Sequence, residues 1–405
     1  MKAKVWKLLG LLFIMIVALS AANTVHAIGV TFTIPVRVGA EAVVYDSGMG
    51  EIFVANYYNN SVSVISASSD TVVATLNLET TPVGLVGTNP DGIAYDSSKG
   101  EIFLTNEADN SVSVISDRSN TVVATINVGN TAEGVAYDSA TDEIFVANYY
   151  SNTVSVISDT NNTVVATVPV GERPVAVVYD SALDEMFVAN AGAESAVGTV
   201  SVISDSNNTI VATVPLEITP SNLAYDSGKG EIFVVSGSSV SIISDSNNTI
   251  VANVNVGMDS VGAAYDPAKG VIFLSGANSP SNGTVWVMSD NTNTIIATLT
   301  LAGRFSYGVA FDPAMGEAFV TSSGGWVFVI SDSSLPSVTP SPTASAQPSP
   351  TASATPSPTV PEFSNAAVIF VIVVLLTAVF GAVERNKSKK SNPTPLIRSR
   401  NEALI

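Results

Sequence analysis

Short apolar segments separated by turn residues fill most of the chain. The clearest run reads GVAYD (134–138), EIFVAN (143–148), TVSVIS (153–158) and TVVATVPV (163–170), with Gly, Asn, Asp or Ser between the segments. Segments of this length that are rich in Val, Ile, Phe and Thr predict β-strands joined by tight hairpins. Because no long segment between the two termini has helical periodicity, the sequence predicts an all-β fold.

The four-segment pattern repeats along the chain. An aromatic–Asp pair ends the first segment of each of seven units: Tyr45-Asp46, Tyr95-Asp96, Tyr137-Asp138, Tyr179-Asp180, Tyr225-Asp226, Tyr265-Asp266 and Phe311-Asp312. Each Asp precedes a turn, where we expect its side chain to accept backbone N–H groups. Four antiparallel strands in a unit of about 42 residues are typical of a propeller blade, so we predict a seven-bladed β-propeller over residues 28–334.

The last unit is one strand short, and the N-terminus holds a spare strand. Segments near 308–312, 317–321 and 326–331 are followed directly by Asp332 and a proline-rich stretch. The segment TFTIPVRVG (31–39) resembles TVVATVPVG (163–171), a fourth strand that leads into the next unit. We therefore expect residues 30–38 to pair with the strand at 326–331, which would close the ring and remove two open edges.

Both ends of the chain are typical of an exported and anchored protein. Residues 1–27 combine three Lys, an apolar run and a small-residue cleavage site, which predicts a signal peptide. Residues 335–361 hold eight Pro and eleven Ser or Thr, which predicts a disordered, extended stalk. Residues 362–383 contain an apolar stretch long enough for a transmembrane helix, and the basic residues of 384–405 predict a cytoplasmic tail. The expected location is the cell surface.

Composition narrows the chemistry that the mature protein can perform. The chain has no Cys, and its one His, His26, lies in the predicted signal peptide. A Ser-His-Asp triad, a cysteine nucleophile and a histidine-ligated metal are therefore excluded. Residues 28–334 carry 7 basic and 32 acidic residues, a net charge of −25, which argues against nucleic acid as a partner. No cofactor is predicted, and the acidic residues leave open an oxygen-ligated Ca²⁺ ion without defining a site for it.

The units differ most in the loops that follow second and fourth strands. Extra residues occur in 79–92, 191–198 and 276–283, and the alternation of a four-strand meander places all three on one face. Tyrosines and carboxylates near that face suit contacts with other cell-envelope proteins or surface glycans. The candidate binding residues are Tyr57, Tyr58, Glu107, Asp109, Tyr149, Tyr150 and Glu194. Insertions that a surface loop simply tolerates are the alternative explanation.

Five Asn-x-Ser/Thr sequences are candidates for N-glycosylation of an exported domain. Three fall in the repeated Ser-Asp-x-Asn-Asn-Thr turns, and two lie elsewhere. The five acceptors are Asn59, Asn161, Asn207, Asn247 and Asn282.

The repeats resemble the YVTN-type β-propeller repeats of archaeal and bacterial surface proteins. The motif position reads FVAN (53–56), FLTN (103–106), FVAN (145–148) and FVAN (187–190), and the last three units read FVVS, FLSG and FVTS. Pro361-Glu362-Phe363 before the apolar stretch is similar to the sorting signals of archaeal surface proteins and leaves open whether the anchor is retained or processed. The resemblance implies a surface-layer or adhesin-like protein. We therefore expect a non-enzymatic module for binding, adhesion or envelope structure, with a carboxylate-based propeller hydrolase or lyase as the alternative.

Overall fold

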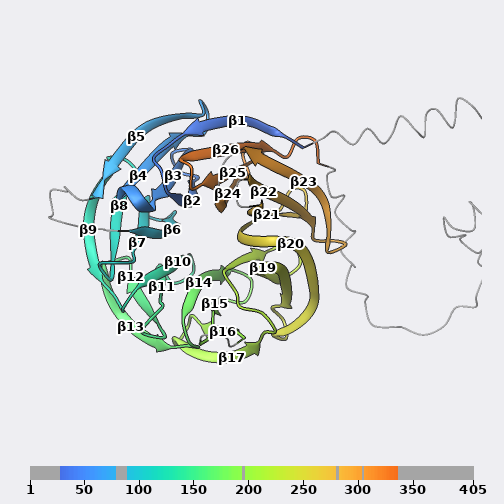
Figure 1. Cartoon of the computed structure of the whole chain (residues 1–405). Coiled ribbons are helices and arrows are strands. Elements are labelled where there is room, and N and C mark those ends of the chain that lie inside the picture. The colour runs from blue at the N-terminus through green and yellow to red at the C-terminus, as the bar shows by residue number, and fades with distance from the viewer. Residues whose placement is uncertain (1–27, 79–88, 194–196, 280–281, 303–304, 336–405) are drawn as a thin grey trace, which may run out of the picture. The chain divides into compact units, whose positions relative to one another are not determined.

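β-Strands make up nearly all of the regular structure in the part of the chain that the structure describes. The computed structural model describes residues 28–78, 89–193, 197–279, 282–302 and 305–335 (Figure 1). The predicted signal peptide, the stalk beyond Leu335, the predicted transmembrane segment, the tail and Glu194 lie outside these ranges. Within them, no helix is long and apolar enough to cross a membrane.

The first three units and the N-terminal strand form β1 to β13, with one 3₁₀ helix, η1 (Tyr57–Asn59). The strands are β1 (Val30–Pro35), β2 (Ala40–Asp46), β3 (Glu51–Asn56), β4 (Ser61–Ser66), β5 (Thr71–Asn77), β6 (Pro90–Asp96), β7 (Glu101–Asn106), β8 (Ser111–Ser116), β9 (Thr121–Asn127), β10 (Ala132–Asp138), β11 (Glu143–Asn148), β12 (Thr153–Ser158) and β13 (Thr163–Pro169).

The remaining units form β14 to β26. The strands are β14 (Pro174–Asp180), β15 (Glu185–Asn190), β16 (Thr199–Ser204), β17 (Thr209–Pro215), β18 (Asn222–Asp226), β19 (Glu231–Ser244), β20 (Thr249–Asp266), β21 (Val271–Ser279), β22 (Asn282–Ser289), β23 (Thr294–Ala302), β24 (Ser306–Asp312), β25 (Glu317–Ser322) and β26 (Trp326–Ser331).

Each repeat folds into an antiparallel sheet in the predicted strand order. In the described chain there are five four-stranded sheets and one six-stranded sheet, β18 to β23. The six-stranded sheet covers two repeats because β19 and β20 are long and each spans two of the expected strands. The sheets are arranged around a common centre, with the first strand of each repeat innermost (Figure 1).

The repeated residues explain why each sheet forms and where the core lies. The second strand of each unit carries one completely buried Phe. Phe103 of β7, for example, packs with Ile144 and Val146 of β11 in the neighbouring sheet. The apolar core therefore lies between adjacent sheets. The Asn of the FVAN motif is also structural, since Asn148 is buried and its Nδ2 donates to the hydroxyl oxygen of Ser155 on the third strand.

The outermost strands carry a bulge that protects their free edges. In β5 the pairing moves from Val64↔Ala74 to Ile65↔Val72, so Val73 is left as the extra residue. The same shift occurs where β13, β17 and β23 pair with their third strands. A bulge twists an edge strand away from flat pairing, and thereby discourages association of one sheet edge with another.

The N-terminal strand joins the last repeat, as the sequence predicts. Strand β1 pairs antiparallel with β26, from Val30↔Ile330 to Pro35↔Trp326. The regular strand ends at Pro35 and not at residue 38, although the Val36 N–H still donates to the Gly325 carbonyl. Contacts between innermost strands run from β2 through β6, β10, β14, β18, β20 and β24, and β24 contacts β2.

One of the three predicted loop enlargements is a longer hairpin and not a loop. The segment 276–283 continues β21 and β22, whose pairing extends from Gly276↔Thr284 to Ser279↔Asn282. Extra residues in this unit are absorbed by the backbone ladder because paired N–H and C=O groups extend it with no loss of hydrogen bonding. In the other two enlargements, residues 79–88 and 194–196 lie outside the described residues.

Candidate functional site

The innermost strand of each unit starts from one end of the central space, and the residue after the Ala, Pro or Ser at that end differs among the units. In the first three units this residue is acidic: Glu41 on β2, Asp91 on β6 and Glu133 on β10. The corresponding residues of the other units are Val175, Ser221, Val261 and Tyr307. Three neighbouring units therefore direct carboxylates to one side of the same opening.

In β2, β6 and β10, a β-bulge interrupts the regular pairing at the acidic residue. Pairing between β10 and β11 passes from Ala132↔Asn148 directly to Val135↔Val146, which leaves Glu133 in a bulge. The same shift brackets Glu41 in β2 and Asp91 in β6. A β-bulge re-aims the side chain that it carries, so the sheets present these carboxylates away from the ladder.

Contacts between units hold the backbone of the bulges in place. The Thr105 hydroxyl donates to the Glu133 carbonyl over 2.6 Å and accepts from the Gly92 N–H over 2.7 Å. A Cβ on Gly92 would come within 2.3 Å of the Glu133 carbonyl oxygen, so only glycine permits this approach. Thr321 makes the matching bond to the Glu41 carbonyl across the junction between the last and first units, over 2.6 Å.

These strand ends surround a cavity of about 470 Å³. Glu41, Asp91 and Glu133 line one part of it, and Val175, Val261 and Tyr307 line another. Among the described residues that line the cavity there is no Lys, Arg or His. The cavity therefore combines an acidic wall, without an internal counter-charge, and a largely apolar wall.

Burial, and then neighbouring negative charges, raise the pKa values of all three cavity carboxyls. Burial, followed by the charges of Asp91 and Glu107, raises the pKa of Glu133 to about 9 and keeps its carboxyl protonated at neutral pH. Burial, followed by the same two charges, raises the pKa of Glu41 to about 7. Burial and the Glu107 charge raise the pKa of Asp91 to about 6. A cation in the cavity would reverse these shifts, because it favours the ionised carboxylates.

Two of the predicted binding residues belong to this site. The Tyr57 hydroxyl, in η1 after β3, donates to Glu107 Oε2 across two units over 2.5 Å. Burial and then this bond to Glu107 raise the pKa of Tyr57. The Glu107 charge acts on all three cavity carboxyls, so Tyr57 and Glu107 stand beside the acidic wall.

The other predicted residues form a looser rim on the same side of the sheets. Tyr58 and Tyr150 are 66% and 64% exposed, and each packs edge to face against the tyrosine before it, Tyr57 and Tyr149. The Arg173 guanidinium lies 5.7 Å from the centre of the Tyr149 ring. Asp109 is exposed in the turn after β7. No contact links the Tyr149–Tyr150 pair to the cavity carboxyls in the described part of the chain.

The sequence analysis missed Glu41, Asp91 and Glu133. They carry no motif, and each lies one residue into an ordinary strand. Alignment of the seven units would have revealed them, because this one position is acidic in the first three units and neutral in the other four.

The repeated aspartates at the opposite ends of the innermost strands are structural, as the sequence predicts. Asp138 is completely buried, and its Oδ1 accepts from the Ala140 N–H over 2.8 Å and the Thr141 N–H over 3.3 Å. The same arrangement recurs at Asp46, Asp96, Asp180, Asp226, Asp266 and Asp312. No three His, Asp or Glu side chains of the described chain are placed to hold a metal ion.

The five glycosylation candidates lie in two different settings. Asn161, Asn207 and Asn247 are exposed in hairpin turns, and each side-chain oxygen accepts from the hydroxyl of the Thr two residues later. Asn59 and Asn282 are also exposed, but the third residues of their sequons, Ser61 and Thr284, are buried.

Comparison with known proteins supports a β-propeller-like fold and gives no family. A chain of hydrazine synthase from Kuenenia stuttgartiensis superimposes with a TM-score of 0.63 at 16% identity, over 73% of this chain and 96% of that chain. At this identity the likeness concerns the fold alone. No protein-family model matches the chain, and no curated protein matches it. The resemblance to YVTN-type repeats and to the archaeal sorting signal therefore depends on the quoted motifs.

Proposed function

We propose that this protein is a cell-surface binding module that holds a basic group of its partner in the cavity at the centre of its sheets. The acidic wall formed by Glu41, Asp91 and Glu133, with no basic side chain among the described residues that line the cavity, is the observation that carries the proposal. A lysine or arginine side chain of another envelope protein fits such a site, because its aliphatic stem can lie on the apolar wall and its charge on the acidic wall. The exposed rings of Tyr58 and Tyr150 would extend the contact surface around it.

The architecture that we propose is a seven-bladed propeller closed by the N-terminal strand. The pairing of β1 with β26 and the contacts of β24 with β2 support it. We further propose export by residues 1–27, a stalk over 335–361 and anchoring by the apolar stretch of 362–383, with the tail in the cytoplasm. Their composition supports these assignments. An exported and acidic domain on a stalk is suited to meet basic partners at the cell surface.

Two double variants, each lacking two carboxyl groups, test the proposed site. The probe is an acetylated and amidated trilysine peptide, titrated calorimetrically into the full-length chain. We expect Asp91→Asn with Glu133→Gln to weaken binding by about tenfold or more, which corresponds to about 1.4 kcal/mol. The control, Glu172→Gln with Glu217→Gln, removes two exposed carboxylates and should weaken binding by less than about twofold. Equal losses in the two variants would show that only the overall charge matters and would reject the cavity.

A carboxylate-based hydrolase or lyase is the second candidate, and one observation favours it. The pKa values of Glu133 and Asp91, about 9 and about 6, leave one carboxyl protonated and the other ionised at neutral pH. An acid and a base of this kind are what glycoside hydrolysis requires. Turnover of aryl glycosides or oligosaccharides that disappears in Glu133→Gln and persists in Glu172→Gln would establish this candidate. Absence of turnover with intact peptide binding would leave the binding function.

A further inference from the structure

The floor of the central cavity is apolar, in contrast to its acidic entrance. Glu41, Asp91 and Glu133 lie at the entrance, where the innermost strands of their units start. Residues two positions further along the innermost strands also line the cavity, about 6 Å deeper at the rise of a β-strand. These deeper residues are all aliphatic: Val43, Ile93, Val135, Val177, Ala263 and Val309. No described residue later on these strands lines the cavity, so this aliphatic ring forms its floor.

The regular pairing of the sheets holds the aliphatic floor in place. Four of its residues form the first ladder pairs after the bulges: Val43↔Val54, Ile93↔Leu104, Val135↔Val146 and Val309↔Val320. Val135 and Val177 are each only 9% exposed. A floor built on paired strands exists before any ligand arrives, so a ligand can fill it with little reorganisation of the protein.

Asn222 of the fifth unit contributes an amide group to the cavity lining. The corresponding residue of every other unit is Ala or Gly: Ala42, Gly92, Gly134, Ala176, Gly262 and Gly308. The Asn222 Oδ1 accepts from the Leu223 N–H over 2.7 Å, and within the described chain no hydrogen bond uses its Nδ2. The contacts between innermost strands place β18 three strands beyond β6 around the centre. Asn222 therefore offers a hydrogen-bond donor on the side of the cavity away from the acidic wall.

These features favour a ligand whose ammonium group lies close to an apolar group. A lysine side chain carries its charge at its tip, so a charge held at the entrance leaves the floor empty. An α-ammonium group lies one carbon from the side chain of the same residue, so the charge can stay at the entrance while the side chain reaches the floor. The three N–H groups of an ammonium also suit separate carboxylates, and no three acidic side chains of the described chain are placed to hold one metal ion.

We propose that the basic group held in the cavity is the free α-ammonium group of a peptide whose first residue is apolar. The ammonium group donates to the carboxylates of Glu41, Asp91 and Glu133, and the first side chain contacts the aliphatic floor. The first peptide carbonyl accepts from the Nδ2 of Asn222. This inference rests on the proposed function and specifies the group that the cavity binds. A volume of about 470 Å³ lies within the range of small-molecule pockets and has room for one amino-terminal residue.

Small probes with one chemical difference each test this inference by calorimetric titration into the full-length chain. We expect leucinamide to bind about tenfold or more tightly than glycinamide, because its side chain is buried on the floor. Nα-acetyl-leucinamide lacks the charge, and Nα-acetyl-lysinamide carries it at the tip of the side chain. Each of these two should bind about tenfold or more weakly than leucinamide.

The outcomes separate this inference from the proposed function. If Nα-acetyl-lysinamide binds as tightly as leucinamide, charge alone accounts for binding, and the inference is overturned while the proposed function stands. If neither leucinamide nor the trilysine peptide binds, both are rejected. Leucylglycylglycinamide should bind at least as tightly as leucinamide. Binding that is about tenfold weaker would show that the cavity takes a small amine and not the amino terminus of a peptide.

A change in the floor tests the position of the apolar side chain. Val177→Thr keeps the shape of the side chain and adds a hydroxyl group to the floor, so it should weaken leucinamide binding by about fivefold or more. Glycinamide, which does not reach the floor, should change by less than about twofold. The matched control Val73→Thr makes the same change at a 52% exposed position of the outer strand and should affect neither probe. Equal changes for the two probes in Val177→Thr would overturn the contact with the floor.

Discussion

The two ends of the innermost strands carry acidic residues of different kinds. At the turn end, an Asp stands in all seven units, is buried, and accepts backbone N–H groups of the following turn. At the cavity end, the equivalent residue of the seven units is Glu, Asp, Glu, Val, Ser, Val and Tyr in turn. Within a repeat protein, a residue that every unit needs for its own turn cannot vary, whereas a residue that faces a shared cavity can differ from unit to unit.

The largest expected effect is a difference in stability between variants at the two ends of β10. Asp138→Ala should lower the free energy of unfolding by about 2 kcal/mol, because two backbone N–H groups of the turn lose their acceptor. At pH 5, Glu133→Ala, five residues earlier, should change it by less than about 0.5 kcal/mol, since the Glu133 side chain bonds to no group of the described chain. Urea denaturation of the full-length chain measures both values.

Asp138→Asn is the control for this pair of variants. The Asn side chain retains an oxygen acceptor, so this variant should lower the free energy of unfolding by less than half as much as Asp138→Ala. If Glu133→Ala proves as destabilising as Asp138→Ala, the cavity end is structural too and the contrast between the two ends fails.

An intermediate effect concerns the pH dependence of stability at the cavity end. The pKa values of Glu41 and Glu133, about 7 and about 9, lie above the unfolded value, so their protonated forms stabilise the fold in acid. This stabilisation is complete below about pH 4 and is lost as the pH rises through 7 and then 9. Raising the pH from 5 to 9 should therefore lower the unfolding midpoint of the wild-type chain. It should lower the midpoint of Glu133→Gln by about 2–4 °C less.

Scanning calorimetry at the two pH values makes this measurement. Glu172→Gln, which changes an exposed carboxylate, should follow the wild-type curve. The trilysine probe should bind more tightly at pH 9 than at pH 6, because the cavity carboxyls ionise over this range. Weaker binding at pH 9 would contradict an acidic wall that acts through its charge.

The smallest expected effect on stability is at the hairpin turns. We expect sugar on Asn161, Asn207 and Asn247, and none on Asn282 or Asn59, because a transferase can reach an exposed Thr but not buried Thr284 or Ser61. Mass spectrometry of peptides from the native host measures occupancy at each site. Replacing Asn161 with Gln should change the free energy of unfolding by less than about 0.5 kcal/mol. Full occupancy of Asn282 would show that modification precedes folding of β22.

The parts of the molecule that follow local rules could be predicted from the sequence. Strand positions, the turn role of the aspartates and the pairing of the N-terminal strand with 326–331 all appear in the structure. The prediction that 276–283 is a loop was wrong, because hydrogen-bonded pairing can lengthen a hairpin without any change in its sequence pattern. For the candidate site, Tyr57 and Glu107 were predicted as binding residues of the same face, but the hydrogen bond between them was not predicted.

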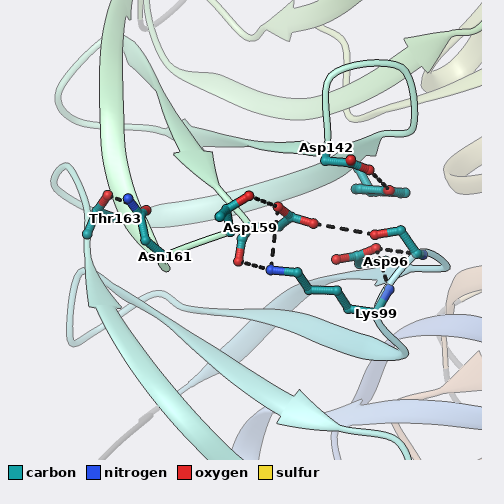
Figure 2. A network of polar contacts seen from close by, with 9 residues as sticks. Asp96, Lys99, Asp142, Asp159, Asn161 and Thr163 are labelled. Carbon is teal, nitrogen blue, oxygen red and sulfur yellow. Dashed lines mark hydrogen bonds and ion pairs between the residues drawn. The ribbon is translucent and has the colours of Figure 1, made fainter.

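The sequence by itself determined the repeat, the strands and the acidic character of the protein, because alternation, turn residues and charge act over a few neighbouring residues. Only the tertiary structure decided which carboxylates line the same cavity. Glu41, Asp91 and Glu133 are separated by more than forty residues along the chain and meet because three bulged strands begin beside one cavity. In the same way, Lys99 meets buried Asp159, sixty residues later in the chain, because the third unit packs against the turn that carries Lys99 (Figure 2).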